Sequence, residues 1–512
     1  MKKFVALSLL TLLSVAAAQQ PQAPPPANPP SHAATKPEKR MTPEQAQQLF
    51  ASIDGVFQFV SRDTGLPIKH PVEKKLSSRD EVEKYILSKM DDDEDTKRFE
   101  RSEVVLKKFG LLPRDFELRP FLVKLLRDQV AGFYDSKTKV VYLLDWVDPE
   151  IQKPVMAHEL THALQDQNFD LEKWGKEDDT RRNAAEKRGD YNQAIALDEA
   201  STAQTAMVEG QGMITLVDYM LKDMGHSAAD SPDMVRAMGN TMEGDNSSPV
   251  LASAPLLLKE TLIFPYRDGM LFVDAVLSAK GKEAAFSGLF ARPPLSSYQV
   301  MTPAAYLDHK PSPSVPLPEM KSLLGDKYAE YDLGAIGEFD VQLLLKQFSD
   351  PRTAAHLTRQ WDGGSYFAAL RKGAPAGQTS SIGLVYVSHW KSPEAATEFA
   401  RVYGGSLARK YKSVTPAECS PCEAGERRWN TDEGMVEIDQ RGNRLLISEG
   451  IETPLVIKLK DAVLAGGGEQ LQATGRELSI SAVPSWMRAI LNPNLLLKLP
   501  DHSARKHSAG IQ

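Results

Sequence analysis

Residues 155–164 read VMAHELTHAL, and this stretch decides how the rest of the chain is interpreted. His158 and His162 are four residues apart, so an α-helix places both imidazoles on one face, one turn from each other. Neutral imidazole is a good zinc ligand. Glu159 would lie close to the metal but angled away from it, where a carboxylate can pass a proton from water to a leaving amine. The stretch therefore predicts a zinc (Zn2+) site with a general base.

A catalytic zinc ion needs a third protein ligand and an open fourth position. The metzincin arrangement places that ligand just downstream, with Gly three residues after the second histidine; here Gln165 and then Asn168 follow, which excludes it. A second class takes a Glu from a separate helix, and the helix expected over residues 194–221 offers two. Glu209 is favoured, because it lies among small and apolar residues where a buried carboxylate needs a partner charge. Glu199 has more polar neighbours and is the alternative.

Several stretches around the motif recur together in known proteins. They are ALQDQ after the second histidine, VAGFYD at 130–135, VEG at 208–210, FPY at 264–266 and PPLSSYQ at 293–299. With these stretches the chain resembles the gluzincins, the thermolysin-like zinc metallopeptidases, and more closely a group of exported bacterial HExxH proteins. The resemblance covers residues 60–310 and, more faintly, 330–410.

The resemblance implies roles for the residues of the motif. His158, His162 and Glu209 would be the zinc ligands and Glu159 the general base of a metallopeptidase that hydrolyses a peptide or protein substrate. The hairpin ending near Leu144 would be the edge strand that pairs with an extended peptide, a mode of binding in which main-chain hydrogen bonds hold the substrate.

One departure from the family pattern concerns the group that stabilises the oxyanion. Relatives carry a His in the segment that here contains Thr302. Tyr298, His309 and Arg267 are the candidates to replace it. The departure also sustains a second hypothesis, in which the chain is a degenerate zinc-binding module that binds or scaffolds partners in the cell envelope.

The N-terminus predicts export. Lys2 and Lys3 precede an apolar run at 4–15, which is too short to span a bilayer, and Ala16 to Ala18 form a cleavage site. We therefore expect a periplasmic or secreted protein without a transmembrane segment. The net charge of −7, with acidic and basic residues mixed, excludes a nucleic-acid-binding arm. The sequence does not indicate an oligomeric state.

The expected fold class is α+β, with a zincin-like domain built from a mixed sheet and the HExxH helix, followed by a smaller α+β domain. Residues 41–128 belong either to the first domain or to an inhibitory pro-segment. Cys419 and Cys422 are expected to form a small disulfide. The predicted parts are a signal peptide at 1–18, a Pro-rich linker at 19–40, the metallopeptidase domain at 41–310, the second domain at 325–500 and a disordered tail at 501–512.

Local patterns predict several elements. Another helix could approach the 194–221 helix closely at its small residues, which are Ala200, Ala203, Ala206, Gly210 and Gly212. Residues 223–250 are predicted to be a polar loop, and FPY to precede a helix. The predicted strands are an edge strand at 67–76, hairpins at 130–144 and around Gly442-Asn443, and a strand at 382–390.

Overall fold

The computed structural model describes residues 40–90, 93–130, 132–242, 248–418 and 425–464. The expected signal peptide, nearly all of the Pro-rich linker, both cysteines and the C-terminal tail lie outside these ranges. Within them, no helix combines the length and the hydropathy that a membrane span requires. The described chain is α+β, as expected.

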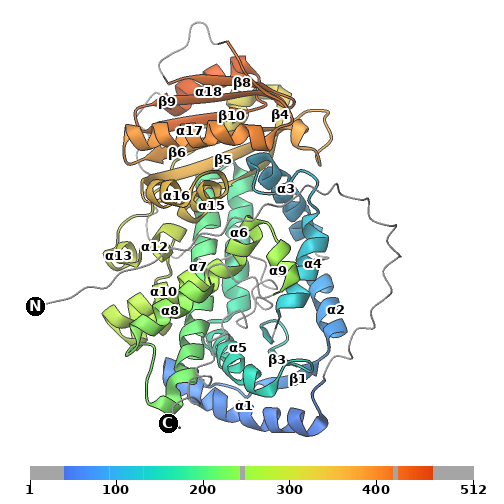
Figure 1. Cartoon of the computed structure of the whole chain (residues 1–512), viewed down its shortest axis with the longest axis vertical. Coiled ribbons are helices and arrows are strands. Elements are labelled where there is room, and N and C mark those ends of the chain that lie inside the picture. The colour runs from blue at the N-terminus through green and yellow to red at the C-terminus, as the bar shows by residue number, and fades with distance from the viewer. Residues whose placement is uncertain (1–39, 91–92, 131, 243–247, 419–424, 465–512) are drawn as a thin grey trace, which may run out of the picture. The chain divides into compact units, whose positions relative to one another are not determined.

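Residues 43–307 are mostly helical and hold one small sheet (Figure 1). The helix starts follow the sequence: Thr42 accepts a hydrogen bond from the backbone of Gln45, and Ser78 and Glu81 form the second cap. The elements are α1 (Pro43–Thr64), β1 (Glu73–Ser77), α2 (Arg79–Met90), α3 (Asp93–Phe109), α4 (Leu118–Gln129), β2 (Phe133–Asp135), β3 (Val140–Leu144), α5 (Pro149–Phe169), α6 (Leu171–Arg188), α7 (Tyr191–Leu221), η1 (Lys222–Met224), α8 (Pro232–Met242), α9 (Pro249–Ser253), α10 (Leu256–Lys280), η2 (Ala284–Gly288), α11 (Leu289–Ala291), α12 (Ser297–Met301) and α13 (Pro303–Leu307).

The small sheet has the strand order β1-β3-β2. The predicted hairpin is confirmed, since β2 pairs antiparallel with β3 and Phe133 lies opposite Tyr142. The strand expected within 67–76 begins later, at Glu73, and pairs parallel with β3. Pro67 and Pro71 lack the N–H that a ladder needs, which explains why pairing starts only after the second proline. The sheet is therefore mixed, with β3 in its centre.

Helices α7 and α10 pack with their backbones in contact. A Cβ added at Gly210 would lie 2.2 Å from the carbonyl oxygen of Gly269, and one at Gly269 would lie 2.0 Å from that of Ala206. Only glycine permits such an approach. The predicted close contact between the 194–221 helix and another helix is confirmed.

Two helical segments correct the sequence expectations. Residues 223–250 contain α8, whose Val235, Met238 and Met242 form a buried apolar face, although the polar composition suggested a loop. Pro265 lies inside α10 rather than before a helix. Its buried neighbours Phe264 and Tyr266 hold the helix through the proline, at a cost of about 3 kcal/mol for the lost bond and the ring clash.

Residues 320–464 build a seven-stranded sheet with the order β4-β5-β6-β10-β9-β8-β7, in which every neighbouring pair is antiparallel. The predicted strand at 382–390 and the predicted hairpin around Gly442 are confirmed. The elements are α14 (Met320–Leu324), η3 (Gly325–Lys327), β4 (Tyr328–Ala335), α15 (Glu338–Phe348), α16 (Pro351–Thr358), β5 (Trp361–Arg371), η4 (Thr379–Ser381), β6 (Ile382–Trp390), α17 (Pro393–Lys410), β7 (Val414–Pro416), β8 (Arg427–Thr431), β9 (Gly434–Arg441), β10 (Arg444–Glu449) and α18 (Thr453–Leu464).

Helices cover both faces of this sheet. Successive side chains of a strand point to opposite faces. Leu445 and Ile447 of β10 belong to the apolar cluster that contains Phe399 of α17. Leu446, between them, belongs to the cluster that contains Leu459 of α18. Helices α17 and α18 therefore lie on opposite faces.

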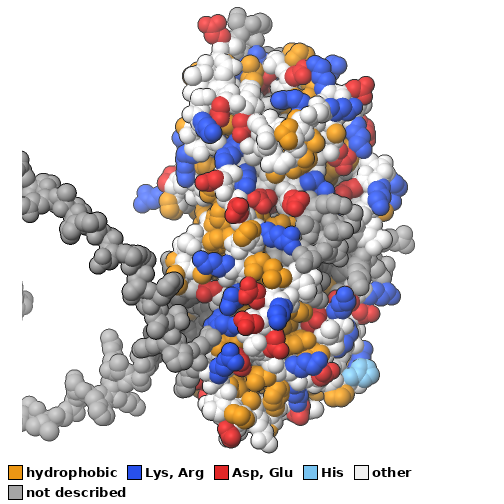
Figure 2. All heavy atoms as spheres, turned by 90° about the vertical axis from the view of Figure 1, so that its right-hand side faces the viewer, with side chains coloured by type: hydrophobic (Ala, Val, Ile, Leu, Met, Phe, Trp, Pro, Cys, Tyr) orange, Lys and Arg blue, Asp and Glu red, His pale blue; other side chains and the backbone are white. Residues whose placement is uncertain are grey.

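The surface is mixed in charge where the space-filling view shows it. On the face drawn in Figure 2, Lys and Arg side chains are interspersed with Asp and Glu, and no single-sign patch dominates.

Candidate metal centre

Helix α5 presents the HExxH residues because its other side is apolar. Asp148 caps its first turn by accepting from the backbone of Glu150. Val155, Leu160 and their apolar neighbours pack against α1 and β3. His158 and His162 point the other way, toward α7, and are almost fully buried.

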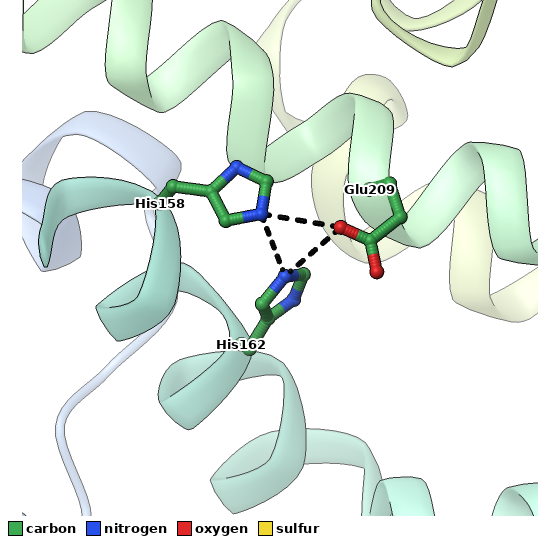
Figure 3. A group of neighbouring side chains, drawn as sticks. All are labelled: His158, His162 and Glu209. Carbon is green, nitrogen blue, oxygen red and sulfur yellow. Dashed lines mark hydrogen bonds and ion pairs between the residues drawn. The ribbon is translucent and has the colours of Figure 1, made fainter. Parts of the chain in front are cut away.

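Three donor atoms from α5 and α7 converge on one point (Figure 3). His158 Nε2 lies 3.1 Å from Glu209 Oε2 and 3.0 Å from His162 Nε2. His162 Nε2 lies 3.3 Å from the same carboxylate oxygen. Tetrahedral zinc at about 2.0–2.1 Å from each ligand separates the ligand atoms by about 3.3 Å. The three atoms are therefore spaced like three corners of a zinc coordination tetrahedron.

Two further observations test whether the residues fit a metal ion. Glu209 Oε1 is buried and has no hydrogen-bond partner among the described residues, an arrangement that is costly unless a ligand or ion completes it. The donor set of two imidazoles and one carboxylate is that of catalytic zinc sites. The residues present fit zinc.

The charges of the cluster reinforce one another in the metal-free protein. Burial opposes the charged form of Glu209, but the two histidines outweigh the effect of burial and lower the pKa of Glu209 to about 2. Likewise burial is outweighed by the charges of Glu209 and Glu159 and by hydrogen bonds, which raise the pKa of His162 to about 9. Burial lowers the pKa of His158. Glu209 is thus an anion at neutral pH, as a ligand must be.

Glu159 is buried beside the cluster and is held by β2. The backbone N–H of Tyr134 donates to Glu159 Oε2 at 2.9 Å. Burial raises the pKa of Glu159 to about 8. The Tyr134 hydroxyl donates to Asp166 at 2.6 Å, and Lys139 forms an ion pair with the same carboxylate. Asp166 is therefore a buried acid that connects the β2–β3 hairpin to α5.

The strand at the edge of the small sheet is not the one that the sequence predicted. The predicted edge strand ending near Leu144 is β3, which has neighbours on both sides, and β2 is the edge of the hairpin. The outward N–H of Tyr134 on this edge is already bound to Glu159. A peptide pairing with β2 would therefore have to compete with Glu159 for this donor.

Tyr266 of α10 belongs to the site, although the sequence analysis did not select it. Its ring centroid lies 5.9 Å from that of His158. Its hydroxyl is buried next to the carboxylate of Glu209. Burial, the charges of Glu209 and Glu159 and a side-chain hydrogen bond to Glu209 raise the pKa of Tyr266 well above its ordinary value. Its place in the FPY stretch was the only signal.

The other named residues lie elsewhere. Arg267 is buried and forms ion pairs with Glu260 and Asp268. His309 contacts Arg292 at the surface, and Tyr298 is half-buried against the apolar core.

Glu199 accepts two hydrogen bonds from Ser297 and contacts Gly337 of the C-terminal region. It lies ten residues before Glu209, about 15 Å away along α7. The structure thus gathers Glu209, and not Glu199, with the two histidines.

A match to a known protein family is found in the C-terminal region. A model of a domain of unknown function, DUF8575, matches residues 327–459. These residues contain all seven strands of the large sheet and most of its helices, so the candidate metal centre lies outside the match. No curated protein and no solved structure matches the chain significantly.

Proposed function

We propose that the chain is an exported zinc metallopeptidase with a zincin-like catalytic region, in which His158, His162 and Glu209 hold zinc and Glu159 is the general base. The observation that carries this proposal is the convergence of three buried donor atoms, 3.0 to 3.3 Å apart, with a buried carboxylate next to them. Export to the periplasm or the medium is part of the proposal and rests on residues 1–18.

Zinc held by these three residues would act as a Lewis acid toward a substrate carbonyl and lower the pKa of a water molecule in the open fourth position. Glu159 takes the proton of the attacking water and delivers it to the leaving amine. The Tyr134 N–H holds the carboxylate of Glu159 in place for both transfers. The surrounding apolar packing excludes bulk water, which strengthens every charge interaction at the site.

We infer that Tyr266 is the donor for the developing oxyanion. Its hydroxyl is buried and lies close enough to Glu209 and Glu159 to interact with both carboxylates. Hydrogen-bond donors aimed at developing charge supply a large share of catalysis in acyl transfer. Tyr266 thus takes the role for which Tyr298, His309 and Arg267 were considered.

The test combines metal analysis with peptide hydrolysis. The purified protein is expected to contain one zinc per chain and to cleave casein or members of a peptide library. Glu159→Gln keeps the shape of the side chain but cannot accept the proton, so zinc should remain while hydrolysis is lost. Glu150→Gln is the matched control, because this acid lies on the exposed first turn of the same helix; it should retain activity.

Two outcomes would contradict the proposal, wholly or in part. Absence of zinc from protein purified and reconstituted under all conditions would remove the metal site altogether. Stoichiometric zinc without hydrolysis of any peptide would favour the alternative, a zinc-binding module that binds or scaffolds partners in the cell envelope.

A further inference from the structure

A chain of buried amides links η2 to the metal centre. The side-chain amide nitrogen of Gln211, on α7, donates to the carbonyl oxygens of Ala285 at 2.7 Å and Phe286 at 3.0 Å. A carbonyl oxygen can only accept, so the nitrogen of this amide must face η2. The Gln211 oxygen is consequently turned the other way, toward α5.

The orientation of the Gln211 amide also determines the orientation of the Gln165 amide. The Gln165 nitrogen donates to Gln211 Oε1 at 2.8 Å and to the carbonyl oxygen of Val208 at 3.1 Å. Both partners are acceptors, which fixes the orientation of this amide as well. Its oxygen lies 2.8 Å from His162 Nδ1 and can only accept, so Nδ1 must carry a proton.

From this one-way series of hydrogen bonds we propose that Gln211 and Gln165 are positioning residues that keep a proton on His162 Nδ1, so that Nε2 is the nitrogen available to bind the metal. The inference rests on the proposed zinc site. The ring nitrogen that bears the proton decides which nitrogen can bind a metal, and partners that fix this choice typically contribute 10–100-fold to metal affinity.

Burial makes this series of hydrogen-bonded amides rigid. Gln165 and Gln211 are both 0% exposed, so water does not compete for their hydrogen bonds. Turning either amide over would set oxygen against oxygen and nitrogen against nitrogen at several contacts at once. Each buried polar group left unpaired costs about 1–3 kcal/mol. The orientation read from the carbonyls of η2 is therefore transmitted to His162 without an alternative of similar energy.

The experiment measures zinc affinity by competition with a chelating indicator, using the full chain. Gln165→Met keeps the length of the side chain and removes the acceptor for Nδ1, so zinc should bind about 10–100-fold more weakly. Nitrogen NMR shifts of the His162 ring in the zinc-loaded parent should show a protonated Nδ1. Gln167→Met is the control: this glutamine, two residues further along α5, binds the backbone of Lys69 and His70 and should leave the zinc affinity unchanged.

A second variant keeps the inference testable if Gln165→Met fails to fold. Gln211→Met acts one link further away and should weaken zinc binding less, because Gln165 still donates to Val208. The double variant should lose no more affinity than Gln165→Met alone, since both act through one chain. Unchanged zinc affinity and an unchanged ring signature in both variants would overturn the inference. If the parent itself binds no zinc, the proposed function fails instead.

Discussion

The Tyr266 hydroxyl is buried beside the carboxylates of Glu209 and Glu159. Its interaction with Glu209 is longer than a close hydrogen bond, so removing the hydroxyl should cost little stability. We predict that Tyr266→Phe keeps or slightly raises the unfolding temperature and keeps its zinc, while kcat falls about 100- to 1,000-fold, as for other single oxyanion donors.

Tyr298→Phe provides the comparison, because the sequence made Tyr298 a candidate for the same role. Tyr298 packs half-buried against the apolar core, and its loss of one oxygen should leave kcat nearly unchanged. If Tyr298→Phe abolishes hydrolysis and Tyr266→Phe does not, the assignment of Tyr266 is wrong.

At the residue scale the local sequence is informative about ligands but not about the groups that surround them. The four-residue spacing of His158 and His162 and the apolar neighbours of Glu209 predicted the three residues that the structure brings together. Tyr266 and Gln211 could not be selected, because each reaches the centre only through the packing of α10 and η2 against α7. The small residues of α7 predict that some helix packs there, but no local pattern tells which helix does or which of its side chains reach the site.

At the scale of the elements, the contact between α7 and α10 positions Glu209, the proposed third ligand. Gly210 follows Glu209 directly and touches the backbone of Gly269. We predict that Gly210→Ala forces the two helices apart, lowers the free energy of unfolding by about 1–3 kcal/mol and weakens zinc binding by displacing Glu209. Denaturant unfolding and zinc titration measure the two effects.

Gly55→Ala is the matched control for this prediction. Gly55 lies in α1, where an added Cβ meets nothing within 4 Å. Replacing glycine by alanine in an unobstructed helix interior should stabilise by about 0.5–1 kcal/mol. Equal effects of the two substitutions would show that the α7–α10 contact does not position the ligand.

Among the elements, those with explicit local signals were predicted and those that depend on packing were not. Thr42 and Ser78 cap helices through hydrogen bonds to residues three positions away, and the predicted β2–β3 hairpin forms around its turn. Helix α8 was missed because its apolar residues are sparse in a polar segment. Pro265 reads locally as a helix breaker, but burial of its neighbours overrides it.

At the scale of the whole molecule, α7 extends from the candidate metal centre to the C-terminal region, where Glu199 lies near the carboxyl groups of Glu338 and Asp340. Burial raises the pKa of Asp340 to about 8, with the Glu199 charge adding to the effect. Burial also raises the pKa of Glu338 to about 7 and that of Glu199 to about 6, although Lys391 and Ser297 respectively oppose it. These groups hold protons at a pH where ordinary carboxyl groups have lost them.

The sign of the pH dependence follows from this difference. The folded chain binds more protons than the unfolded chain between the ordinary carboxyl pKa values and the raised values of about 6 to 8. The contribution of these groups to stability is complete below the ordinary values and is lost as pH rises through the raised ones. We predict that the unfolding temperature of the parent falls between pH 5 and pH 8 and that Asp340→Asn flattens this fall.

Asparagine at position 340 can still accept the hydrogen bond that Asp340 receives from the Gly337 N–H. Asp340→Asn should therefore exceed the parent in stability by more at pH 8 than at pH 5. Scanning calorimetry at both pH values provides the measurement, and parallel pH profiles of parent and variant would contradict the prediction.

The central claim is that His158, His162 and Glu209 hold one zinc ion. Diffraction from crystals of the full chain, with anomalous differences collected on either side of the zinc absorption edge, tests it most directly. The account predicts a single strong zinc peak within about 2.0–2.2 Å of both Nε2 atoms and a Glu209 oxygen. A zinc peak on other residues, or none at this cluster in zinc-reconstituted protein, would contradict it.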